Sequence, residues 1–324
     1  MIVRWGLDEL GDLLLELDIM RPLLVSTERW AHLELPVRSR FLGVEAHVPV
    51  ATVEAAARAV AGSDGLVGLG GGSAIDTTKA VSAQTGLPVV SIPTTYSGAE
   101  WTAFFGVLDP ATRTKGGGGG ARLAGIVYEP ELTLGLPPAE SAGTALNALA
   151  HCAEALYATG RQAAGDRPAL AGAGLISGWL PAVLADGSEL EPRTQLLRGA
   201  AAAGEALAIS GLALAHAMAQ ALGGRYGLPH GALNAICLPP ALRFNEPVVG
   251  EQLRRLADAM ETDDAASRAE ELARSAGFRR LRELGVPEGE LEEVAALAAV
   301  RAGARANPRP AGPPEIAALL RSVW

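Results

Sequence analysis

The chain has 324 residues, of which 49% are hydrophobic and 19% charged, and its formal net charge is −9. This length suits two domains that each bury a core, and this balance excludes an intrinsically disordered protein. The excess of acidic residues excludes nucleic acid as a partner, because phosphate backbones are bound by clustered Lys and Arg.

The first third of the chain alternates strand and helix patterns. This alternation is typical of a parallel sheet covered by helices. We therefore predict an α/β class, with a doubly wound, dinucleotide-binding domain over residues 1–136. The predicted strands are residues 2–5, 22–26, 66–69 and 89–92, and the predicted helices are residues 7–17, 53–61 and 75–83.

A glycine-rich turn separates the third of these strands from the helix that follows it. Gly70, Gly71 and Gly72 are followed by Ser73 at the start of the helical pattern. N–H groups at a helix start are unsatisfied and carry the positive end of the helix dipole, and glycine lets a pyrophosphate approach the backbone. We therefore predict a phosphate-binding turn. A second polar loop, residues 93–100, follows the next strand, where open α/β sheets place ligands.

The pattern changes at Pro137 to long, Ala- and Leu-rich helical segments with almost no strand signal. We place a domain boundary there and predict an all-α domain over residues 137–324. Five successive glycines before it, at 116–120, predict a mobile loop. The predicted helices are residues 140–158, 170–180 (interrupted by Pro181), 198–222, and 231–238 (stopped by Pro239 and Pro240), followed by surface helices over 252–305.

The cysteines and the apolar segments indicate the compartment. Cys152 and Cys237 lie in apolar helical sequence without a paired framework, as reduced thiols of a cytoplasmic protein do. The N-terminus carries acidic residues where a signal peptide needs a basic start, so we expect no export signal. Residues 200–223 imitate a membrane span, but they are built of Ala and Gly more than Leu or Phe. We expect one buried helix there, and no membrane.

Three histidines of the helical domain form a constellation with an asparagine. Asn147 and His151 are four residues apart, so they project from one face of a helix. His216 lies on the long apolar helix, and His230 begins the next one. Three imidazoles and one oxygen from neighbouring helices can surround a divalent cation. The alternative is that each histidine is an ordinary core or surface residue.

These motifs resemble those of the group III, iron-dependent alcohol dehydrogenases, which share the dehydroquinate synthase-like fold. Within that family the chain is most similar to the maleylacetate reductases, through residues 94–102, 127–137 and 147–157. The resemblance runs in order over nearly the whole chain. The matching segments are residues 70–79, 92–95, 129–133, 147–151, 216–220, 228–231 and 307–310.

The resemblance implies hydride transfer from NADH or NADPH to a carbonyl or an activated double bond. Thr27 stands where NAD-selective relatives carry an acid for the ribose hydroxyl, so we expect NADPH to be accepted as well as NADH. Arg29 nearby is able to attract a 2′-phosphate. The implied cofactor-binding residues are Gly70, Gly71, Gly72 and Ser73 at the pyrophosphate, Asp76 at the ribose or nicotinamide side, Thr94 and Thr95 on the opposite lip, and Thr27.

Two departures from the family pattern bear on the chemistry. The implied metal ligands are Asn147, His151, His216 and His230, but metal-dependent members have an aspartate at the position of Asn147. A neutral amide there lowers the affinity for iron or zinc, and the maleylacetate reductase branch also carries asparagine. Gln220 replaces a histidine of the relatives, so proton delivery falls to His151, His216, His230, Tyr96 or water.

We therefore expect an NAD(P)H-dependent reductase of a small carboxylate substrate. The leading hypothesis is reduction of maleylacetate to 3-oxoadipate in aromatic degradation, by a cytoplasmic homodimer. Two alternatives stay open, an iron- or zinc-dependent alcohol or aldehyde dehydrogenase and a non-catalytic nucleotide-binding relative. A cyclising lyase on this fold is disfavoured, because the helical domain contains no lysine.

Overall fold

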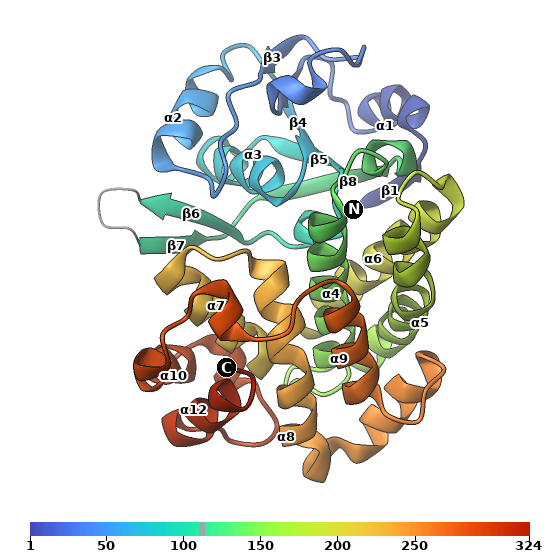
Figure 1. Ribbon diagram of the computed structural model, residues 1–324. Coiled ribbons are helices and arrows are strands. Elements are labelled where there is room, and N and C mark those ends of the chain that lie inside the picture. The colour runs from blue at the N-terminus through green and yellow to red at the C-terminus, as the bar shows by residue number, and fades with distance from the viewer. Residues whose placement is uncertain (110–113) are drawn as a thin grey trace. The chain divides into compact units, whose positions relative to one another are not determined.

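The computed structural model describes residues 1–109 and 114–324, which form two compact units (Figure 1). Unit 1 comprises residues 1–95 and 99–133, and unit 2 comprises residues 96–98 and 134–324. The main division, after Thr133, lies close to the predicted boundary at Pro137. The three residues 96–98 were not expected to belong with the helices.

Unit 1 is built on a six-stranded sheet in which all neighbouring strands are parallel, in the order β1-β8-β5-β4-β2-β3. The four predicted strands are all present, with bounds that differ by at most one residue. The sequence patterns did not reveal β3, which has only three residues, or β8. The strands are β1 Ile2–Trp5, β2 Pro22–Val25, β3 Ser39–Phe41, β4 Gly65–Gly70, β5 Pro88–Pro93 and β8 Arg122–Tyr128.

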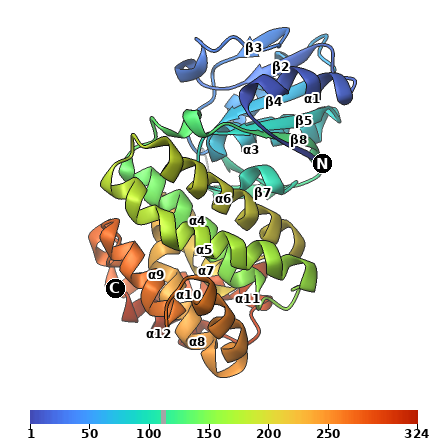
Figure 2. The ribbon, with the colours of Figure 1, turned by 90° about the vertical axis from the view of Figure 1, so that its right-hand side faces the viewer.

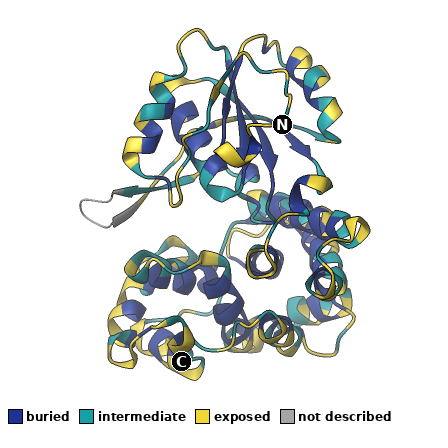
Figure 3. Ribbon diagram, turned by 45° about the horizontal axis from the view of Figure 1, so that its top comes forward, coloured by how far each residue is buried: buried dark blue, intermediate teal, exposed yellow. Residues whose placement is uncertain are grey.

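Helices cover both faces of this sheet, as the doubly wound prediction requires. Side chains of a strand alternate between the two faces. Val67 and its neighbours in register pack with α1 (Leu10–Glu16), whereas Leu66 packs with α2 (Val50–Arg58) and α3 (Gly72–Thr85). Both faces are therefore buried, which Figure 3 shows for the central strands. The three predicted helices are confirmed.

A separate two-stranded antiparallel sheet joins β6 (Phe105–Asp109) to β7 (Thr114–Gly118). The prediction of a loop at the five glycines is wrong for residues 116–118, because they belong to β7. Phe105 pairs with Gly118, and a Cβ atom at Gly118 would overlap the Phe105 ring. The missing side chain thus makes room for an aromatic ring across the strand pair.

Unit 2 is all-helical in its described secondary structure, and α4 is its central helix. Nearly every residue of α4 after its first turn is buried, and α4 contacts α5, α6 and α8 (Figure 2). Pro138 at its first position suits a helix start. The helices are α4 Pro138–Ala155, α5 Ala163–Ala185, α6 Leu190–Ser210, α7 Leu214–Tyr226, α8 His230–Ala259, α9 Ala265–Ser275, α10 Leu291–Ala299, α11 Ala302–Arg305 and α12 Pro313–Ser322.

The predicted single helix over 198–222 is wrong, because the chain breaks there into α6 and α7, which are bent by 101°. Gly211 ends α6 with a φ of 80°, a backbone conformation that favours glycine. The break places His216 near the start of a helix instead of in its interior. The composition of the sequence did not reveal this break, because alanine and leucine are frequent both before and after Gly211.

Two predicted helix ends at prolines are also wrong. Pro181 lies inside α5, and Pro239 and Pro240 lie inside α8. A proline removes one helix hydrogen bond, but packing can maintain the helix around it. Pro239 and Pro240 are buried, and α8 contacts α4, α7 and α9. A kink in α8 occurs later, at Val249.

Among the described residues, α5 is the one helix long and apolar enough to cross a membrane. The pair of α6 and α7 passes that test only together, across its bend. A core helix of a globular domain passes the same test. Packing of α5 against α4, α6 and α8 agrees with that interpretation.

We predict that Gly231→Ala lowers the free energy of unfolding by about 2–3 kcal/mol. A Cβ atom at Gly231 would overlap the backbone carbonyl of Gly143, so α4 and α8 would have to separate. Gly178→Ala is the matched control, because it also replaces a helical glycine but meets nothing within 4 Å. We expect it to stabilise by about 0.5–1 kcal/mol. Urea titration measures both, and an unchanged stability of Gly231→Ala would contradict the close packing.

Candidate active site

The predicted cofactor residues of unit 1 lie at one edge of the sheet. Thr27 follows β2, Gly70 to Gly72 end β4, and Thr94 and Thr95 follow β5. These three strands are neighbours and parallel, so their carboxyl ends meet. In open parallel sheets that edge is where ligands bind.

The glycine turn itself is shaped for an approaching anion. Gly70 has a φ of 143°, and a Cβ atom at Gly71 would lie 2.9 Å from the methyl group of Thr95. Thr94 N donates to Gly70 O at 3.0 Å, which ties the two loops together. Gly71 is the N-cap of α3 and provides no capping side chain. The start of α3 can therefore receive a phosphate on its backbone N–H groups.

Other predicted cofactor residues have partners of their own within unit 1. The carboxylate of Asp76 forms an ion pair with Lys79 Nζ at 2.8 Å and accepts from Gly106 N at 3.0 Å. The hydrogen bond from Gly106 N ties Asp76 of α3 to β6, and Lys79, which is 1% exposed, holds the same carboxylate from inside the unit. Ser73 Oγ accepts from His47 N at 3.2 Å, and Arg29 stacks over the Trp30 ring. Asp76 has a structural role that the sequence did not reveal.

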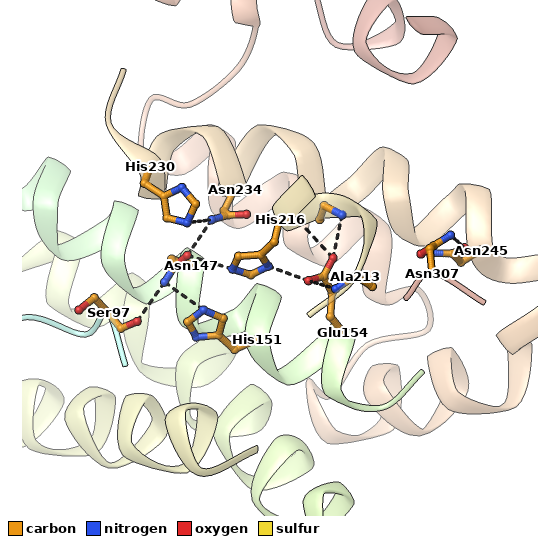
Figure 4. Close-up of polar contacts among 11 residues, drawn as sticks. Ser97, Asn147, His151, Glu154, Ala213, His216, His230, Asn234, Asn245 and Asn307 are labelled. Atoms are coloured by element: carbon orange, nitrogen blue, oxygen red, sulfur yellow. Dashed lines mark hydrogen bonds and ion pairs between the residues drawn. The ribbon is translucent and has the colours of Figure 1, made fainter. Parts of the chain in front are cut away.

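The three histidines of unit 2 come together, as the sequence predicted (Figure 4). The ring centroids of His151 and His216 are 4.7 Å apart and the rings are stacked. The rings of His216 and His230 are tilted, with centroids 5.7 Å apart. His151 and His216 are buried, whereas His230 is exposed at the start of α8. Helices α4, α7 and α8 each contribute one ring.

The amide of Asn147 lies between these rings, and its orientation is fixed by a backbone carbonyl. Asn147 Nδ2 lies 3.1 Å from Ser97 O, and a carbonyl oxygen only accepts hydrogen bonds. The same nitrogen lies 3.4 Å from His151 Nε2, which must therefore accept. Asn147 Oδ1 lies 3.3 Å from His216 Nε2, which must therefore donate. One amide thus assigns opposite roles to two imidazoles.

Asn234 extends this network to the third ring. Asn234 Nδ2 donates to Asn147 Oδ1 at 2.7 Å and to His230 Nε2 at 2.9 Å. His230 Nε2 is consequently an acceptor. Within this network, two buried polar atoms have no partner among the described residues, His151 Nδ1 and Asn234 Oδ1. The first must carry the proton of the His151 ring, so it is an unused donor.

The electrostatics agree with a neutral His151. Burial lowers the pKa of His151 well below its usual range, and repulsion from His216 and His230 lowers that pKa further. His216 faces acceptors on both sides, because its Nδ1 lies 2.7 Å from the carboxylate of Glu154. Glu154 also accepts backbone N–H groups at the start of α7. The carboxylate of Glu154 and the amide oxygen of Asn147 thus lie at opposite edges of the His216 ring.

Tyr96 and Gln220 do not join this network. Tyr96 is 0% exposed, and its hydroxyl lies 3.3 Å from Arg193 Nη1. Arg193 is itself 2% exposed and also donates to Ser141 Oγ at 2.9 Å. Gln220 is half-buried, one turn after His216 on α7. The Tyr96 ring instead helps to fix the segment that carries Ser97.

Comparison with known proteins identifies the family. The iron-containing alcohol dehydrogenase profile matches residues 5–124, and the C-terminal profile of the Fe-containing alcohol dehydrogenase family matches residues 141–324. The chain belongs to the iron-containing alcohol dehydrogenase family. It is an NAD(P)-dependent oxidoreductase, and its similarity to known reductases supports a reductase function.

Several similar proteins are maleylacetate reductases. The one from Pseudomonas sp. (strain P51) is 33% identical over 329 residues, covering 98% of this chain and 93% of that protein. The one from Sphingobium indicum is 37% identical over 278 residues, covering 85% and 78%. The crystal structure of maleylacetate reductase from Rhizobium sp. strain MTP-10005 has a TM-score of 0.91 at 32% identity, covering 100% of this chain and 95% of that one.

Members of this family use NAD(P) and a divalent metal, so the four predicted metal ligands can be tested against the geometry. They do not fit a cation. The lone pair of His151 Nε2 and both lone pairs of Asn147 Oδ1 are taken by N–H donors, and His216 Nε2 is a donor. In the described ranges 1–109 and 114–324, no group of three His, Cys, Asp or Glu side chains is arranged to hold a metal. The donor set also lacks an anionic ligand.

Sequence reasoning missed three groups of this site. Glu154 lies seven residues after Asn147 on α4, and Asn234 lies four residues after His230 on α8. Helical spacing therefore places Glu154 on the same face of α4 as Asn147, and Asn234 on the same face of α8 as His230. The carbonyl of Ser97 had no sequence signal, since any residue provides one.

We predict that Asn147→Asp converts this network into a metal site at a cost in stability. The aspartate cannot donate to Ser97 O or to His151, so without metal the free energy of unfolding falls by about 2–4 kcal/mol. Its carboxylate supplies the missing anionic ligand, so Zn²⁺ should raise the melting temperature of the variant and leave the wild type unchanged.

Asn245→Asp is the matched control, because Asn245 is 0% exposed and paired with Asn307 away from the histidines. It should lose stability without any response to Zn²⁺. Differential scanning fluorimetry with EDTA or Zn²⁺ separates these cases. A wild type that purifies with one equivalent of iron or zinc would show that these four residues do hold a cation.

Proposed function

We propose that the protein reduces maleylacetate, or a closely similar small oxo-dicarboxylate, to 3-oxoadipate in aromatic degradation, as a cytoplasmic homodimer. The similarity to maleylacetate reductases supports the substrate. The observation that carries the proposal is the amide of Asn147 in place of a metal-binding carboxylate. Beside it lie His216 Nε2–H, which donates to Asn147 Oδ1, and the unpartnered His151 Nδ1–H, both of a kind suited to a carbonyl oxygen.

In this proposal residues 1–136 form the cofactor domain and residues 137–324 form the substrate domain. NADPH or NADH supplies the hydride when bound. The N–H groups at Gly70 to Ser73 receive the pyrophosphate, and Thr94 and Thr95 hold the cofactor from the neighbouring loop. Thr27 faces the ribose without a carboxylate, so a 2′-phosphate is not repelled. Asp76 connects the first turns of α3 to β6 through Gly106 N.

The residues of unit 2 stabilise the charge that develops during reduction. Hydride adds to the carbon–carbon double bond conjugated with the ketone, and the electron pair moves to the ketone oxygen, forming an enolate. The unused His151 Nδ1–H is the free donor for that oxygen, and His216 Nε2–H, which donates to Asn147 Oδ1 in this structure, is shared with it. A proton on the carbon next to the ketone completes 3-oxoadipate, and His230, which is exposed, or water delivers it.

Tyr96 was predicted as a further proton donor, and in this proposal it acts indirectly. Its hydroxyl is bound to buried Arg193, so its contribution is to hold the segment that presents Ser97 O to Asn147. Metal chemistry takes no part in these steps.

We expect the purified protein to oxidise NADPH or NADH with maleylacetate at a rate that EDTA does not reduce. His216→Asn should lower kcat by about 10²–10⁴-fold, because it removes the donor that meets the enolate oxygen. Absorbance at the nicotinamide band measures both. Turnover that requires added iron or zinc would support the metal-dependent alcohol dehydrogenase instead. Cofactor binding without turnover on any oxo-acid or alcohol would support a non-catalytic relative.

We expect Thr27→Asp to discriminate against NADPH. A carboxylate at this position repels the 2′-phosphate and binds the ribose hydroxyl, so KM for NADPH should rise about tenfold or more while KM for NADH does not rise. Thr27→Val removes the hydroxyl without adding charge and is the matched control. Equal effects of the two substitutions would place the ribose elsewhere.

A further inference from the structure

A buried carboxylate on α4 is the strongest unassigned feature near the histidines. Glu154 is 0% exposed, and its oxygens face four nitrogens of one short stretch of chain (Figure 4). Oε2 accepts from Ala213 N at 2.8 Å and lies 2.7 Å from His216 Nδ1. Oε1 accepts from Ala215 N at 2.7 Å and His216 N at 3.3 Å. These donors offset the cost of burying a charge.

Glu154 provides the cap that α7 lacks. The N-cap residue Ala213 has no acceptor side chain, and an N-cap side chain ordinarily accepts from the second or third residue of its helix. Counting from Leu214, those residues are Ala215 and His216, and Glu154 accepts from both. Its negative charge also lies at the positive end of the helix dipole. The cap of α7 thus comes from α4.

The same carboxylate orients the ring of His216. His216 presents both its backbone N–H and its ring Nδ1 to Glu154, so the residue is held at two points. The opposite edge of the ring then carries Nε2 toward Asn147 Oδ1, at 3.3 Å. A rotation of the ring would break the Glu154 contact and the Asn147 contact together.

We propose that Glu154 is a positioning residue of the reductase. It holds the start of α7 and the His216 ring so that Nε2–H is directed to the side of Asn147, where the substrate oxygen is stabilised. This assignment rests on the proposed role of His216 in the reaction. Glu154 is fully buried and acts through His216, without contact to the substrate.

Glu154→Gln tests the requirement for a carboxylate with almost no change in shape. All four facing nitrogens act as donors, so an amide places its NH₂ group against at least one of them. We expect kcat to fall about 10- to 100-fold while KM changes by less than about threefold. A kcat within twofold of the wild type would overturn the proposal.

A second substitution separates the effect of Glu154 on the cap of α7 from its effect on the His216 ring. Ala213→Ser in the Glu154→Gln protein supplies a local N-cap, which should recover the melting temperature but not kcat. Recovery of kcat together with stability would show that Glu154 acts only through the helix, and would overturn the positioning role. If Glu154→Gln alone does not fold, kcat of the double variant is compared with that of the wild type instead.

Ring ¹⁵N NMR of histidine-labelled protein gives a readout that needs no substrate. The His216 signals, assigned by their loss in His216→Asn, should report a protonated Nδ1 in the wild type and a changed Nδ1 in Glu154→Gln and in the double variant. Unchanged ring signals would overturn the proposal. A wild type inactive on maleylacetate would refute the proposed function but would leave this ring assignment standing.

Asp166→Asn is the matched control for loss of a buried carboxylate. Asp166 is 8% exposed and pairs with Arg161 and Arg255 on the same unit, without contact to the histidine network. It should lose stability and keep kcat and the His216 ring signals. Loss of kcat equal to that of Glu154→Gln would mean that general destabilisation explains both, against the proposal.

Discussion

The side-chain amide of Asn147 is the group on which the site depends. An amide has two donor hydrogens and two acceptor lone pairs, and all four are used here, toward Ser97 O, His151, His216 and Asn234. Because Ser97 O only accepts, it sets the direction of every other hydrogen bond in the network. The three imidazoles are therefore not equivalent. His216 Nε2 donates, whereas the corresponding nitrogens of His151 and His230 accept.

Several features of the backbone make this network possible. The break at Gly211 turns the chain by 101°, so that His216 stands at the start of α7 beside α4. The close contact of Gly231 with Gly143 brings α8 against α4 and with it Asn234. Gly98, with a φ of 75°, lets the chain pass close to the His151 ring. Gly211 and Gly98 supply backbone angles that favour glycine, whereas Gly231 serves a contact that a side chain would prevent.

The sequence predicted the parallel sheet, the glycine turn and the meeting of the three histidines, because periodicity and i, i+4 spacing are local properties. It did not predict what decides the chemistry. The orientation of Asn147 is set by a carbonyl 50 residues away in sequence, and carbonyls carry no sequence signal. The start of α7 after the break is capped by Glu154, which lies on another helix. The helices continue through Pro181, Pro239 and Pro240 because tertiary packing outweighs the local cost.

An asparagine in place of a metal-binding aspartate not only removes one ligand but also changes the hydrogen bonds of the neighbouring groups. Its NH₂ group finds acceptors at Ser97 O and at His151 Nε2, and its oxygen receives donors from His216 and Asn234. A cation entering this site would have to displace hydrogen bonds at each of these groups and would gain no negative charge in return. The site therefore keeps the family's imidazoles but offers N–H donors where a Lewis acid would stand. A keto-acid that becomes an enolate matches such donors, since negative charge then develops on one oxygen. The fold is common to the family, and the chemistry that we propose depends on the amide placed at the centre of the site.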